Sequence, residues 1–135
     1  MQFLKSFFIL ICLSVSLSVS ADKESGHIKV NFYTLASMHP ELDGKKIALR
    51  GWIAFYDYGN YQKVLLFPSQ ASRDEFNIQE SVKIDIVKED FEAARQYLSN
   101  NIVIVYGTYK SESLDNIKLF GRITKVEDID IVSVD

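Results

Sequence analysis

Alternation of apolar and polar residues predicts that most of this chain folds into short β-strands. The longest such segment covers residues 45–58, where the apolar residues of one face recur at every second position: Ile47, Leu49, Ile53 and Phe55. Gly51 takes the remaining inward position, and a glycine there predicts a bend or bulge where the strand passes from one sheet into another. A long, bent first strand indicates a small closed barrel.

Four further segments have the composition of strands and are separated by turn residues: 62–67, 81–87, 102–110 and 117–126. Gly59-Asn60 is a two-residue hairpin signal between the first two strands. Gly107 and Gly121 predict sharp bends in the fourth and fifth strands. Residues 27–30 are a candidate edge strand, and 128–134 form a last alternating segment. We expect an apolar outer patch or two buried faces for the run 64–67, which does not alternate.

Two segments have helical periodicity. In residues 31–38 the apolar positions share one face, Asn31 is placed to cap the helix, and Pro40 ends it. Residues 89–98 begin with acidic side chains and carry a stripe of Phe91, Ala94 and Leu98. The polar segment 69–80 predicts a long loop with at most one helical turn, at 72–76.

The order of these elements is three strands, a helix, and two more strands. A five-strand meander would suit an SH3-like barrel equally well, but the helix between the third and fourth strands favours an OB-fold. The sequence therefore predicts a mainly β protein, with a five- to six-stranded OB-fold-like barrel over residues 31–135 and a short N-terminal helix.

Residues 1–21 have the pattern of a secretory signal peptide. A basic start with Lys5 is followed by an apolar run and by small residues at Ser18, Ser20 and Ala21. The apolar run is shorter than the roughly 20 residues that a membrane span needs, and Ile11 before Cys12 does not suit a lipoprotein. We expect an exported protein, periplasmic or secreted, with no stable membrane span after cleavage and a flexible lead-in at 22–30.

Composition narrows the chemistry of the mature chain. Its single cysteine, Cys12, lies in the predicted signal peptide, so no disulfide or thiolate site is expected. The full sequence carries a net charge of −3, no basic block is present, and nucleic acid is therefore not an expected partner. His27 and His39 lie outside any catalytic or metal-binding motif, and carboxylates such as Asp128 and Asp130 lack calcium-loop spacing. We expect neither an enzyme nor a cofactor or metal.

Two segments carry a resemblance to a known group of proteins. Residues 39–52 contain Pro40, Asp43-Gly44-Lys45 and a strand that runs into Gly51-Trp52, and residues 103–108 form a second apolar strand with Gly107. This pattern resembles uncharacterised bacterial exported proteins with an OB-fold-like barrel, over nearly the whole mature chain. The resemblance implies a fold and a compartment, and it transfers no catalytic residues.

Tyrosines are the candidate binding residues. Tyr56, Tyr58 and Tyr61 surround the first hairpin, and Tyr109 ends the fourth strand near the other variable loop of an OB-fold. Rings there can stack on a ligand, although tyrosine also suits strands for structural reasons. Trp52 is expected to pack beneath the N-terminal helix.

The predicted function is an exported, non-enzymatic binding module for a small molecule, a glycan or a peptide. The alternative is a structural or envelope-associated domain that contacts other proteins through residues 64–67. Single-stranded nucleic-acid binding, a familiar role of OB-folds, ranks third because the chain is acidic.

Overall fold

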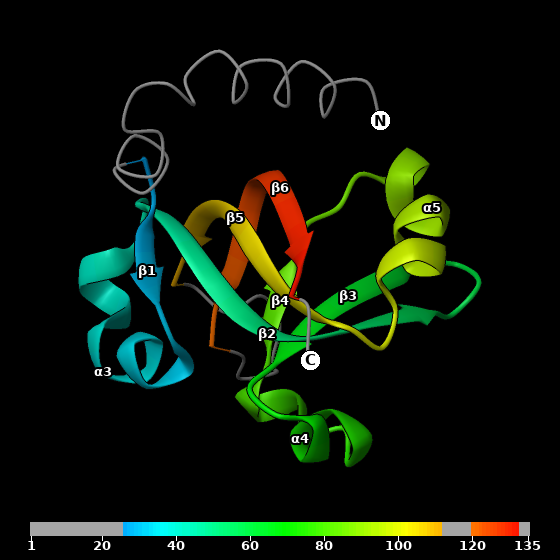
Figure 1. The fold of residues 1–135 in the computed structure, drawn as a ribbon, viewed down its shortest axis with the longest axis horizontal. Coiled ribbons are helices and arrows are strands. Elements are labelled where there is room, and N and C mark those ends of the chain that lie inside the picture. Colours follow the sequence, from blue (N-terminus) through cyan, green and yellow to red (C-terminus); the bar gives the residue numbers. More distant parts are fainter. Residues whose placement is uncertain (1–25, 112–119, 133–135) are drawn as a thin grey trace.

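A computed structural model describes residues 26–111 and 120–132 of the chain (Figure 1). Within these residues six strands form one sheet, and five of them close into a barrel because β2 also pairs with β5. The strands are β1 (Ile28–Val30), β2 (Lys46–Asp57), β3 (Gln62–Phe67), β4 (Val82–Ile84), β5 (Ile102–Lys110) and β6 (Arg122–Ile131). The helices are α3 (Phe32–Leu42), α4 (Gln70–Asp74), α5 (Lys88–Leu98) and the 3₁₀ turn η1 (Ile78–Glu80). The predicted OB-fold-like barrel, with its helix between the third and fourth barrel strands, is confirmed.

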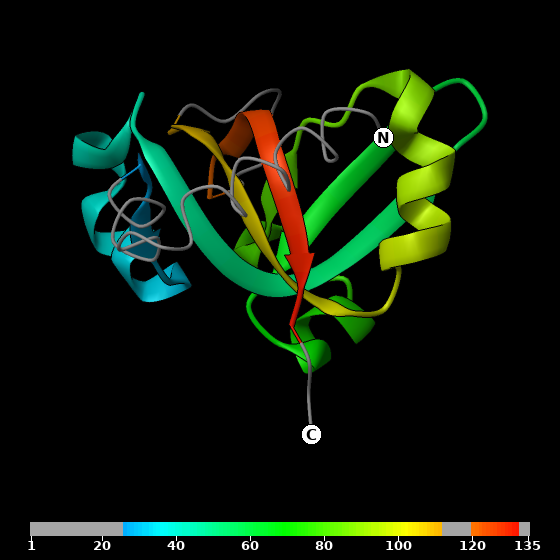
Figure 2. The ribbon, with the colours of Figure 1, turned by 45° about the horizontal axis from the view of Figure 1, so that its top comes forward.

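Strand β2 is the long central strand of the barrel wall, and Figure 2 shows it curving beneath the other strands. It pairs with β5 from Lys46 to Trp52 and with β3 from Trp52 to Asp57, so it changes partners at Trp52. At Gly51 a Cβ atom would lie 2.7 Å from Leu66 Cγ and 2.7 Å from the Phe67 carbonyl oxygen. The bend predicted at Gly51 therefore coincides with a backbone approach that only glycine permits.

The N-terminal part packs outside the barrel. Strand β1 runs parallel to β2, with Ile28 opposite Ile47, so residues 28–30 of the predicted flexible lead-in are ordered strand. Asn31 caps α3 as predicted, because its Oδ1 accepts a hydrogen bond of 2.8 Å from the Thr34 N–H. The expected stop at Pro40 is wrong. The helix kinks at Met38 and continues to Leu42, and the first turn of the second part tolerates a proline, which lacks an N–H.

Strand β3 has two buried faces. Val64 and Leu66 point into the barrel core, while Leu65 and Phe67 are fully buried on the other face. Helix α4 covers that outer face, and its first turn is capped by Ser69, whose Oγ accepts a hydrogen bond from Ser72 N–H at 3.0 Å. The alternative contact surface at residues 64–67 is therefore not available to a partner. The predicted loop 69–80 contains α4 and η1 instead of one turn at 72–76.

The last two strands differ in length from the prediction. The third barrel strand, expected over 81–87, ends at Ile84. Strand β6 runs unbroken over 122–131, where a strand ending at 126 and a separate segment were expected; residues 117–119 and 133–134 of those predictions lie outside the described residues. The bend at Gly107 is confirmed as a register shift between β5 and β6. There a Cβ would lie 2.8 Å from the Thr124 carbonyl oxygen.

In the part of the chain that the structure describes, no helix has both the length and the apolar character needed to cross a membrane.

The close approach at Gly51 leads to a stability prediction. Gly51→Ala should lower the free energy of unfolding by about 1–3 kcal/mol, because the added methyl group must displace Leu66 or the β3 backbone. Urea denaturation followed by circular dichroism measures the change. Gly26→Ala is the matched control, since a Cβ at Gly26 meets nothing within 4 Å. Equal stability of the two variants would contradict the proposed role of Gly51.

Candidate functional site

Four aromatic rings line up along the outer side of the first hairpin. They form what we call the aromatic ladder: Tyr61, Tyr58, Tyr56 and Phe76. The Tyr58 and Tyr61 rings stack with centroids 4.9 Å apart at 28°, and the Tyr56 and Tyr58 rings lie 6.5 Å apart at 14°. Phe76 meets Tyr56 edge-on at 5.1 Å. Three of the four rings are well exposed, with 47% of Tyr58, 54% of Tyr61 and 42% of Phe76 open to solvent.

Local sequence explains why the tyrosines meet. Tyr56 lies on β2 and Tyr58 directly follows its last residue, so their side chains, two positions apart, leave the same side of the chain. The Asp57 carboxylate accepts a hydrogen bond of 2.9 Å from Gly59 N–H, and Gly59 takes a φ of +88°. The Tyr58 N–H then donates to the Tyr61 carbonyl at 3.0 Å. The predicted Gly59-Asn60 turn thus forms, and it brings three of the four predicted site residues together.

Phe76 is the member of the ladder that sequence reasoning missed. It follows α4 in a segment without periodicity, and its N–H donates to the Arg73 carbonyl at 3.0 Å. Phe76 takes a φ of +53°, a left-handed conformation that side chains rarely adopt. The sequence does not predict this turn, because left-handed turns are usually recognised by a glycine or an asparagine and this one has a phenylalanine.

Two cations accompany the aromatic rings. Lys63 Nζ lies 5.8 Å from the centroid of the Tyr58 ring, and Arg73 Cζ lies 5.1 Å from the centroid of Trp52. Trp52 is thus half-buried under Arg73 of α4, whereas the sequence had suggested the N-terminal helix. Burial, with a smaller contribution from the neighbouring Tyr58, raises the pKa of Tyr56. The Tyr56 hydroxyl is therefore a neutral donor and acceptor at neutral pH.

Tyr109, the fourth predicted site residue, is not part of the ladder. Its side chain is fully buried, and its hydroxyl donates a hydrogen bond of 2.6 Å to the Phe120 carbonyl. Burial raises the pKa of Tyr109 to about 12. The expectation that it faces a ligand is corrected, because Tyr109 follows the inward series of β5 at every second position: Val103, Val105, Gly107 and Tyr109. That alternation was visible in the sequence and identifies Tyr109 as a core residue.

Two ionisable residues elsewhere, His27 and Asp43, have polar partners. His27 Nε2 lies 3.3 Å from the Glu127 carboxylate and edge-on to Tyr106. The Asp43 carboxylate accepts a hydrogen bond of 2.8 Å from Ser111 N–H, which lowers the pKa of Asp43. Among the residues that the structure describes, no cluster of three or more His, Cys, Asp or Glu side chains is placed to hold a metal ion.

Comparison with known proteins places the chain by fold. No protein-family model matches it, and no curated protein matches it. Two OBodies, each bound to hen egg-white lysozyme, are similar in structure at a TM-score of 0.50 and 17% identity, over 73% of this chain and 91% of theirs. Asparaginyl-tRNA synthetase from Pyrococcus horikoshii also matches, at a TM-score of 0.43 and 24% identity, over 71% of this chain and 21% of the synthetase.

At 17% identity the two OBodies support the OB-fold-like barrel and nothing finer. The resemblance to bacterial exported proteins stays a prediction, as do the signal peptide and the compartment.

The buried hydroxyl of Tyr109 leads to a pH prediction. Because the folded protein holds this proton more tightly than the unfolded chain, its contribution to stability is complete below pH 10 and is lost as the pH rises through about 12. Tyr109→Phe should cost about 1–2 kcal/mol at neutral pH, since the Phe120 carbonyl loses its partner. The variant should also lose less stability between pH 10 and 12.

Urea denaturation at several pH values measures both effects, and ultraviolet titration follows tyrosine ionisation. Tyr33→Phe is the control, because Tyr33 is 88% exposed. If wild type and Tyr109→Phe declined in parallel above pH 10, the buried hydroxyl would not be the cause.

Proposed function

We propose that this protein is an exported, non-enzymatic binding module that takes a partner polypeptide on the aromatic ladder. The observation that carries the proposal is the exposure of stacked tyrosine rings at the tip of a rigid hairpin. Tyr58 and Tyr61 remain about half exposed although they stack on each other. Large aromatic side chains in this condition are typical of interaction surfaces.

The stacking geometry favours a polypeptide over a flat or sugar-like ligand. A glycan or a base needs the open face of a ring. In the ladder, Tyr58 has Tyr61 and Tyr56 on either side and Lys63 5.8 Å from its centre. Tyr58, at the centre of the ladder, therefore presents mainly its ring edge and hydroxyl group. Such groups suit the mixed apolar and hydrogen-bonding chemistry of protein interfaces, where tyrosine is enriched.

The fold comparison gives this proposal limited support by analogy. The OBodies with a similar barrel are bound to a protein, lysozyme. The alternative function, an envelope-associated interaction domain, would have to use the same surface, because the contact region expected for it at 64–67 is buried. Nucleic-acid binding remains the weaker candidate, since the chain carries a net charge of −3.

The binding proposal is tested with a peptide-display library panned against the full mature protein. Selected peptides should bind the double variant Tyr58→Ala/Tyr61→Ala at least about tenfold more weakly, as expected for interface hot spots. Isothermal titration calorimetry gives the affinities, and a glycan array and a single-stranded oligonucleotide are measured in parallel.

Tyr33→Ala is the matched control, an exposed tyrosine on α3 away from the ladder. Peptides that bind the double variant as tightly as wild type would place the interface elsewhere. Tight glycan or oligonucleotide binding without any peptide binder would replace the proposed partner class.

Export is tested separately. Expressed with its own N-terminus in a secreting bacterial host, the protein should appear outside the cytoplasm with Ala21 or Asp22 as its first residue. Intact-mass spectrometry of the recovered protein identifies that residue. A charged substitution in the apolar run, Leu10→Arg, should retain the full-length chain in the cytoplasm. Recovery of the uncleaved wild-type chain from the cytoplasm would refute the export proposal.

A further inference from the structure

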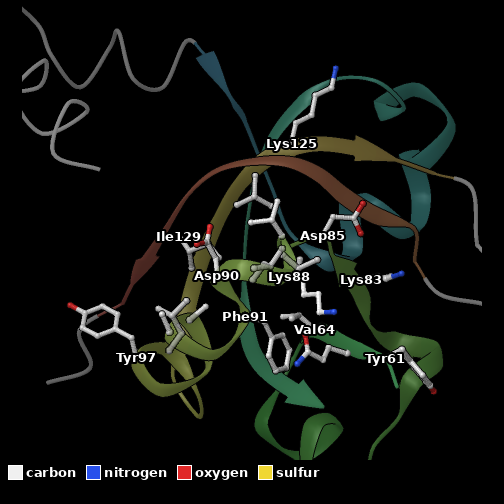
Figure 3. A pocket seen from close by; sticks show the side chains of 18 of the residues that line it. Tyr61, Val64, Lys83, Asp85, Lys88, Asp90, Phe91, Tyr97, Lys125 and Ile129 are labelled. Atoms are coloured by element: carbon white, nitrogen blue, oxygen red, sulfur yellow. The ribbon is translucent and has the colours of Figure 1, made fainter. Parts of the chain in front are cut away.

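A cavity of about 970 Å³ opens between α5 and the barrel (Figure 3). It exists because β4 ends early. The last backbone hydrogen bond between the β4 segment and β6 runs from Asp85 N–H to the Ile123 carbonyl at 3.0 Å. Beyond it the chain leaves for α5, so the part of β6 that contains Val126 and Ile129 faces the helix across the gap.

The walls of the cavity are largely apolar. They come from β3, the segment after β4, α5 and β6: Val64, Ile86, Phe91, Leu98, Val126 and Ile129. Its volume is in the upper part of the range of roughly 300–1,000 Å³ that is usual for small-molecule sites. Strands β3 and β6, the segment after β4 and helix α5 thus line a space that suits an apolar chain.

The charges around the cavity favour an anion at one end. Lys88 reaches over the cavity towards Val64, and Lys83 lies on the same side, across from Asp90 and Ile129 (Figure 3). Among the described residues neither lysine takes part in an ion pair. Four carboxylates also line the cavity, those of Asp85, Asp90, Glu127 and Asp128. Asp90 lies on the far side from Lys83, and Asp128 Oδ1 accepts a hydrogen bond of 2.9 Å from Ile129 N–H. The other two are paired with cations.

Asp85 Oδ2 lies 3.2 Å from Arg122 Nη1, and Glu127 Oε2 lies 3.2 Å from Lys46 Nζ. With these acids neutralised by other partners, the lysine end of the cavity complements a negative charge. An apolar interior with a cation at one end matches a molecule that has an apolar chain and an anionic head.

We propose that this cavity binds a single-chain amphiphile with an anionic head, of the fatty-acid type. The head group lies beside Lys88, and the chain lies against Phe91, Leu98 and Ile129. This site goes beyond the proposed polypeptide interface and does not depend on it. A free carboxylate and a phospholipid share this chemistry, and the experiment separates them.

Calorimetric titration of the mature protein with dodecanoate, below its micelle concentration, should show saturable binding. Decanoate should bind about tenfold more weakly because it buries less chain, and uncharged dodecanol about tenfold more weakly because it lacks the charge. Vesicles of anionic phospholipid should not compete. Absence of dodecanoate binding, or equal affinity for dodecanol, would overturn the proposal, and so would binding to vesicles alone.

Two variants locate the site. Lys88→Gln should weaken dodecanoate about tenfold and leave dodecanol unchanged, while Arg50→Gln, the same charge change on the exposed side of β2, should affect neither. Ala93→Trp should abolish both, because Ala93 lines the cavity yet is exposed and its replacement disturbs no core packing. Dodecanoate binding unchanged by both Lys88→Gln and Ala93→Trp would show that it binds elsewhere. Tyr58→Ala should bind dodecanoate normally whatever the fate of the polypeptide proposal.

Discussion

At Gly51 the backbone of β2 runs so close to β3 that a methyl group would meet both Leu66 and the Phe67 carbonyl at 2.7 Å. One residue later, Trp52 pairs with Ile102 on one side and Phe67 on the other. This contact lets a single strand belong to two pairings, which closes a barrel from a short chain. The core residues on β2, β3 and β5 reach one another because of it.

The same strand determines where the two candidate surfaces lie. Its second half forms a hairpin with β3 (Figure 2), and the exposed Tyr58 and Tyr61 lie in the connection between these two strands. On the other side, β4 contributes only three residues and pairs with β6 at Lys83 and Ile84. Helix α5 takes the place that a longer strand would fill. An amphipathic helix fits that gap less closely than a strand would, and the cavity is the result.

Periodicity predicted the parts of the fold in which burial dominates. Residues 62–67 and 102–110 form strands with the predicted bounds, because apolar side chains and clear turns frame them. Periodicity did not predict features that depend on local geometry, namely Pro40 inside α3 and the short helix at 70–74. It also misplaced the end of β4, which stops at Ile84 although Ile86 continues the alternation. For the ladder, the hairpin signal was sufficient for three tyrosines, but Phe76 depends on a left-handed turn without a signature.

The turn at Gly59 is common to both proposed sites. Gly59, Asn60 and Tyr61 border the cavity, and the Tyr61 ring also stacks on Tyr58. Backbone groups and the Asp57 carboxylate hold the turn, through the bonds from Gly59 N–H and Tyr58 N–H. Replacing a tyrosine ring leaves those bonds in place, whereas replacing Gly59 would change the turn and both sites together. Substitution of the Tyr58 ring, which does not line the cavity, can therefore separate the polypeptide surface from the cavity, whereas a change at Tyr61 or in the turn cannot.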